Sequence, residues 1–68
     1  MDLKTIERLQ LEYDDLKFKT LKLKNFIETE YYETIPTNHQ NLLNIQLSLM
    51  TAYLDVLKMR LNSVLNEK

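Results

Sequence analysis

The chain has 68 residues, no cysteine, no glycine, one proline and a net charge of −1. This length allows one small domain, and the lack of cysteine excludes a disulfide framework and a thiolate metal site. The near-neutral charge argues against a duplex-DNA interface, and the lack of glycine argues against a fold built from several β-hairpins.

Apolar residues make up 44% of the chain, which is too many for a disordered protein. The first ten residues, MDLKTIERLQ, lack the apolar core of a signal peptide. The longest uncharged run, residues 34–54, contains a proline and several amides, so we do not expect it to span a membrane. These features predict a soluble intracellular protein of the all-α class.

A first helix is predicted from about residue 2 to about residue 32. Its apolar residues alternate at spacings of three and four, which is typical of a helix that packs along one face. This pattern passes through KFKTLKLK (residues 17–24), whose alternation of charged and apolar residues would favour a strand if read alone. The longer pattern outweighs the shorter one, so we expect helix. The pattern comprises Ile6, Leu9, Tyr13, Leu16, Thr20, Leu23 and Ile27.

A second helix is predicted from about residue 38 to about residue 66, after a loop at about residues 33–37. Pro36 disfavours helix at the residue before it, and Thr37 with Gln40 has the spacing of a capping box. The short loop predicts that the two helices form an antiparallel hairpin, a single domain over residues 1–68. The apolar pattern of the second helix comprises Leu43, Leu47, Met50, Leu54, Leu57, Leu61 and Val64.

The second helix carries another apolar series, which we call the outer stripe, on the side opposite the first. A lone hairpin cannot bury both sides of one helix, and chains this short seldom fold without a metal, disulfides or partners. We therefore expect a homo-oligomer; the alternative is that these residues only enlarge one core. The outer stripe comprises Leu42, Ile45, Leu49, Ala52, Val56 and Met59, and the first helix adds Leu11, Phe18 and Leu21 outside its main series.

Four lysines lie within residues 17–24, and helical spacing divides them between two sides of the helix. Lys17 and Lys24 share one side, and Lys19 and Lys22 share the other. The simplest interpretation of such lysines is a solvated face. No arrangement of residues suggests an enzyme, a metal site or a cofactor site, because we find no glycine-rich phosphate loop, no histidine–carboxylate cluster and no nucleophile–base pair.

Tyr53 and Arg60 lie seven residues apart along one edge of the second helix, in a row with Gln46. An arginine beside an aromatic ring at the rim of an interface can bind a phosphate and offer a surface to a base. Two plainer interpretations remain open. Arg60 can pair with an acid of the first helix, and Tyr13 and Tyr53 can serve only in packing.

Two ordered patterns in the chain, one in each predicted helix and the second in two parts, resemble a family of small phage helical-hairpin proteins. Residues 15–27 match E-L-x-x-K-x-x-K-L-x-x-F-I, with aspartate in place of the glutamate. Residues 40–53 match Q-x-L-L-x-x-Q-x-x-x-M-x-x-Y, and residues 57–61 match L-x-x-R-[IL]. The resemblance covers about residues 6–61. This family includes anti-CBASS and anti-Thoeris proteins, which are sponges for the cyclic nucleotide signals of bacterial defence systems.

The resemblance implies a homo-oligomer, a hexamer, with ligand pockets between protomers in the cytoplasm of an infected bacterium. Lys19 and Arg60 match family positions that contact phosphate, and Lys22, Tyr13 and Tyr53 complete the expected cyclic-nucleotide site. An aromatic residue expected near the start to stack on a base has no counterpart, and Tyr13 is the nearest substitute. The expected function is sequestration of cyclic di- or trinucleotides without cleavage. The alternatives are a module that docks on a host protein through the outer stripe, and a structural bundle without a ligand.

Overall fold

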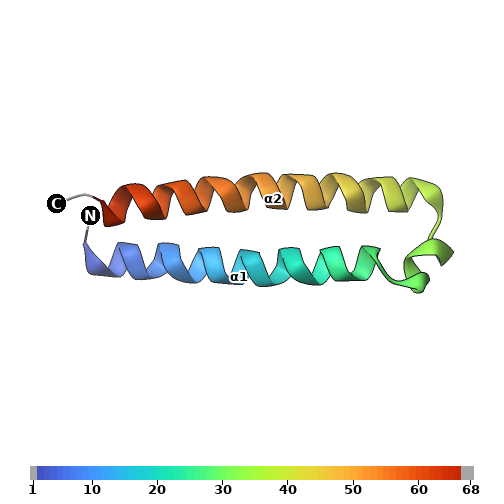
Figure 1. Ribbon diagram of the computed structural model, residues 1–68, viewed down its shortest axis with the longest axis horizontal. Coiled ribbons are helices and arrows are strands. Elements are labelled where there is room, and N and C mark those ends of the chain that lie inside the picture. Colours follow the sequence, from blue (N-terminus) through green and yellow to red (C-terminus); the bar gives the residue numbers. More distant parts are fainter. Residues whose placement is uncertain (1, 67–68) are drawn as a thin grey trace.

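The protein is an antiparallel helical hairpin, as seen in a computed structural model that describes residues 2–66. Helix α1 spans Leu3–Ile27 and helix α2 spans Thr37–Leu65, and a short 3₁₀ helix, Glu30–Thr34, lies between them. The two long helices run side by side, so that the start of α1 and the end of α2 lie at the same end of the molecule (Figure 1). The hairpin is a rod that measures 51 × 14 × 13 Å. The all-helical hairpin and the helical state of residues 17–24 confirm the sequence predictions.

Helix α1 ends at Ile27, about five residues before the predicted end. The chain leaves the helix at Thr29, whose backbone is extended and whose hydroxyl donates to the Phe26 carbonyl at 2.6 Å. A threonine side chain that takes up a terminal carbonyl in this way competes with the next helical hydrogen bond. The 3₁₀ helix then leads to Ile35, which is extended as expected for the residue before a proline.

The predicted capping box at the start of α2 is wrong. Pro36 precedes the helix, Thr37 is its first residue, and no side chain caps it. The Gln40 amide instead donates to the carbonyls of Tyr32, at 3.0 Å, and Ile35, at 2.9 Å. The Tyr32 hydroxyl returns a hydrogen bond to the Gln40 carbonyl at 3.1 Å. Gln40 is thus used to tie the turn to α2, because the turn carbonyls left without helical partners need donors.

The core is a seam between the two helices, and both predicted series lie in it. Every member of the two series is buried or half-buried, which confirms this prediction. The most deeply buried residues lie toward the end of the rod that holds the start of α1 and the end of α2. They are Leu9, Leu57, Leu61 and Val64, with Ile6, Tyr13 and Leu16 packed against them. Among residues 2–66, Thr20 is the one polar residue that is buried; its hydroxyl donates to the Leu16 carbonyl at 2.7 Å, so its burial leaves no unmet donor.

The outer stripe of α2 remains exposed along its whole length, as do Leu11, Phe18 and Leu21 of α1. Leu49 is 66% exposed and Val56 44%, whereas Leu57 in the seam is fully buried. Within residues 2–66, the hairpin therefore buries one side of α2 and leaves the opposite apolar side exposed.

Candidate site at one flank of the hairpin

One hydrogen bond between side chains of the two helices shows their register and marks the flank where the candidate residues gather. The Tyr53 hydroxyl of α2 donates a hydrogen bond to the Glu12 carboxylate of α1. Residues seven apart on a helix share a side, so this contact extends into two facing rows. We call this side of the hairpin the Tyr53 flank. Its rows are Glu12 and Lys19 on α1, and Gln46, Tyr53 and Arg60 on α2.

Two groups of opposite charge act on the hydroxyl of Tyr53. The hydrogen bond to the Glu12 carboxylate raises the pKa of Tyr53 above its usual value of 10.0, and the positive charge of Arg60 acts in the opposite direction. Both groups therefore lie within electrostatic reach of the same hydroxyl. Tyr53 therefore holds its proton and donates it to the Glu12 carboxylate.

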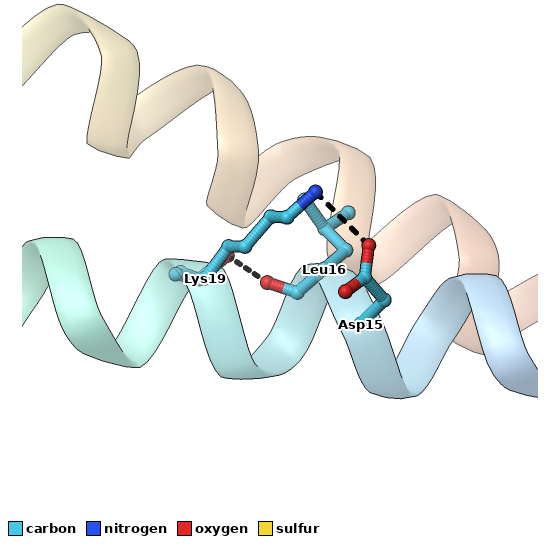
Figure 2. Close-up of polar contacts among 4 residues, drawn as sticks. Asp15, Leu16 and Lys19 are labelled. Atoms are coloured by element: carbon cyan, nitrogen blue, oxygen red, sulfur yellow. Dashed lines mark hydrogen bonds and ion pairs between the residues drawn. The ribbon is translucent and has the colours of Figure 1, made fainter.

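Lys19, one of the two residues matched to phosphate contacts, is paired with an acid on its own helix. Its Nζ lies 3.0 Å from the Asp15 Oδ2, four residues earlier (Figure 2). The Lys19 side chain is 63% exposed and the Asp15 side chain 65%. Such an exposed pair is weak, so Lys19 remains accessible to a stronger anionic partner.

Lys22 lies three residues beyond Lys19 on the outer edge of the same flank. Its Nζ is 5.3 Å from the centre of the Phe18 ring, which is a cation–π contact. Both side chains are exposed, so this contact orients the ammonium group without covering it. Lys17 and Lys24 lie on the opposite flank, as their spacing predicts.

Tyr13 differs from the other candidate residues because it belongs to the seam. Its ring is half-buried and packs against the cluster formed by Leu9, Leu57 and neighbouring residues. The ring therefore packs mainly in the core, and only its exposed part is open to a ligand.

The structure does not bring Lys19 and Arg60 together within one chain. Since Glu12 faces Tyr53, Lys19 faces the level of Gln46, and Arg60 lies two heptads farther along α2. At the rise of an α-helix this separation is about 20 Å along the rod. The surface formed by residues 2–66 also contains no pocket. A compact ligand cannot bridge both cations of one hairpin.

The outer stripe borders the Tyr53 flank, and the other flank of α2 is polar. Leu42, Leu49 and Val56 each precede a member of the Gln46–Tyr53–Arg60 row by four residues, so they are its neighbours on the helix surface. On the other flank the corresponding exposed residues are polar: Asn41, Ser48, Asp55 and Asn62. The cations of the candidate site thus share one side of the hairpin with its unpartnered apolar surface.

Sequence reasoning missed two residues of this flank, Glu12 and Asp15. The spacing of four between Asp15 and Lys19 is a signal that could have shown their pairing in advance. Glu12 could be identified only after the register of the hairpin was known, because Tyr53 is 41 positions away in the chain.

Within the part of the chain that the structure describes, no three histidine or acidic side chains lie close enough together to hold a metal ion. Neither long helix, over its described residues, is long and apolar enough to cross a membrane.

Comparison with known proteins gives one match, to a protein family. The model of the family described as Sequestin matches residues 3–63 of this chain. None of the curated proteins and none of the solved structures match it. The matched range includes both helices nearly in full and all the candidate residues, and it confirms the family resemblance that the two sequence patterns indicate.

Proposed function

The chain belongs to the Sequestin family, and from this premise we propose that it sequesters cyclic di- or trinucleotide signals of bacterial defence systems without cleaving them. In this proposal it is a phage protein that acts in the infected cell. The family name denotes sequestration of a ligand, and a binding protein rather than a catalyst. The observation that carries the specific proposal is the placement of Lys19, Lys22 and Arg60 on one flank, beside an exposed apolar stripe.

The proposed site lies between protomers of a homo-oligomer, with a hexamer as the expected state. Two features support this location. The hairpin alone has no pocket in its described part, and Lys19 and Arg60 are too far apart to meet one ligand within a chain. Burial of the outer stripe against a second hairpin would bring the Tyr53 flanks of different chains together, because the stripe and the flank are adjacent on α2.

The chemistry of the flank fits a ligand that combines negative charge with flat rings. Lys19 and Arg60 would bind phosphates through charge-assisted hydrogen bonds, each worth on the order of 1.5–3 kcal/mol. Tyr53 and the exposed part of Tyr13 would pack against bases, which adds on the order of 1–3 kcal/mol per base. A cyclic dinucleotide has two phosphates in a two-fold arrangement, so symmetry-related protomers can meet it with the same residues twice.

Sequestration of this kind needs only mass action. The free concentration of the signal falls when the binding sites outnumber the signal molecules and bind them more tightly than the effector protein does. Two phosphates, each bound by Lys19 and Arg60, and two packed bases contribute about 8–18 kcal/mol before the cost of association is subtracted. A micromolar affinity requires that about 8 kcal/mol of this remain.

A second candidate function is a protein-interaction module, and the exposed outer stripe favours it equally. In that case a host protein covers the stripe, and the lysines only keep the surface soluble. The two functions differ in what binds at the Tyr53 flank, since the module needs no nucleotide there.

Titration calorimetry with cyclic di-AMP, cyclic di-GMP, cyclic GMP–AMP and cyclic tri-AMP tests the proposal. We expect Lys19→Ala to weaken the best ligand at least about tenfold, which corresponds to about 1.4 kcal/mol. Lys17→Ala is the matched control: it removes the same charge from the opposite flank and should change affinity far less. Equal losses for both variants would indicate diffuse electrostatics rather than a site, and no heat with any ligand would favour the interaction module.

A further inference from the structure

One of the cations assigned to phosphate, Lys19, has a carboxylate neighbour in the ligand-free hairpin. The Lys19 ammonium contacts Asp15 directly at 3.0 Å (Figure 2). At this position the flank therefore presents an ion pair to an approaching ligand rather than a free positive charge.

The Asp15 carboxylate lies against the ammonium group that an incoming phosphate would contact. A phosphate bound by Lys19 competes with Asp15 for the donor hydrogens of that group, and like charges in such proximity repel each other. Because the Lys19–Asp15 pair is exposed, it is weak enough to be exchanged.

We propose that Asp15 is an internal counter-anion of the site, which a ligand phosphate replaces when it binds to Lys19. This inference rests on the proposed function, since it takes Lys19 as a phosphate contact. When one phosphate replaces the Asp15 carboxylate at a single Lys19, little binding free energy is gained. A ligand with one phosphate is therefore held poorly, and only a ligand that meets several cations at once, with its bases packed, is retained.

The inference predicts that neutralising Asp15 strengthens phosphate binding. An exposed ion pair of this kind corresponds to a change of about two- to fivefold in an equilibrium constant. AMP, which meets one Lys19, should gain this factor in the Asp15→Asn variant. A cyclic dinucleotide that meets two Lys19 side chains from symmetry-related chains should gain about the square of it, roughly four- to twenty-five-fold.

Asp14→Asn is the matched control. Asp14 is adjacent in the sequence and the substitution changes the net charge equally, but its carboxylate lies on the polar flank, where it accepts a hydrogen bond from Gln10 at 3.1 Å.

The experiment measures the binding of the four cyclic nucleotides named above, and of AMP in competition, to the unmodified full chain and the two variants. Circular dichroism confirms that each variant is helical. Tighter binding by Asp15→Asn, with Asp14→Asn unchanged, supports the inference. If Asp15→Asn binds like Asp14→Asn, or more weakly than the unmodified chain, the inference is overturned and the proposed function stands. If the unmodified chain binds none of the cyclic nucleotides, the proposed function fails and the inference fails with it.

Discussion

Replacement of Leu49 and Val56 by glutamate should dissociate the assembly that we propose for the outer stripe. In the single hairpin these side chains are 66% and 44% exposed. Complete burial of a Leu or Val side chain is worth about 1.5–3 kcal/mol, so the burial left to an oligomer amounts to about 2–3 kcal/mol per protomer for the two residues together. The double variant loses this free energy of association.

The variant also places two carboxylates in the proposed interface. Burial of an unpaired charge costs several kcal/mol even after local relaxation, so the total loss exceeds about 5 kcal/mol per protomer. The dissociation constant should then rise by about a thousandfold or more. The helical content should fall less than the degree of association, because both positions are exposed in the hairpin and lie outside the seam.

Sedimentation velocity and circular dichroism at micromolar concentration measure the two effects together. The matched control is Ser48→Glu with Asn62→Glu, which adds the same charge to the polar flank of α2 and should leave the assembly intact. The reasoning is refuted if the unmodified protein is a fully helical monomer at this concentration. It is also refuted if the control variant dissociates as readily as the stripe variant.

Two further predictions concern the seam and the flank. Leu57→Ala removes a fully buried side chain and should lower the free energy of unfolding by about 2–5 kcal/mol in thermal melts, whereas Leu3→Ala, at an exposed position, should stay within about 0.5 kcal/mol; equal effects would contradict the packing of the seam. The pKa of Tyr53 is raised by its hydrogen bond to Glu12, so this contact stabilises the hairpin below the usual tyrosine pKa of 10.0 and is lost as the pH rises through the higher folded value. Tyrosinate absorbance should therefore show one late-titrating tyrosine that disappears in Tyr53→Phe and moves toward its usual pKa in Glu12→Gln, and early titration of Tyr53 in the unmodified protein would contradict the contact.

The seam could be predicted from sequence because burial repeats with the period of the helix. Both apolar series lie where the spacing places them, and even Thr20 is buried, since its hydroxyl finds a carbonyl one turn earlier. The ends of the helices could not be predicted as well. Thr29 and Gln40 use their side chains to satisfy carbonyls around the turn, and the partners of such bonds depend on the three-dimensional path of the chain.

The candidate site, too, could be predicted from sequence only in part. Spacing alone places Lys19 and Lys22 on one side of α1 and puts Tyr53 and Arg60 in one row on α2. The facing of Tyr53 and Glu12 depends on the register between two helices, which a single sequence does not specify. The separation of Lys19 from Arg60 follows from that register too, and it favours the location between protomers that the family resemblance implies.

The most direct test of the proposed function is native mass spectrometry of the purified full chain with and without the four cyclic nucleotides, followed by denaturation and analysis of the released ligand. The proposal predicts a homo-oligomer whose mass increases by whole numbers of ligand molecules, and a released cyclic nucleotide of unchanged mass. An oligomer that takes up none of the four, or a ligand released in cleaved form, would contradict it.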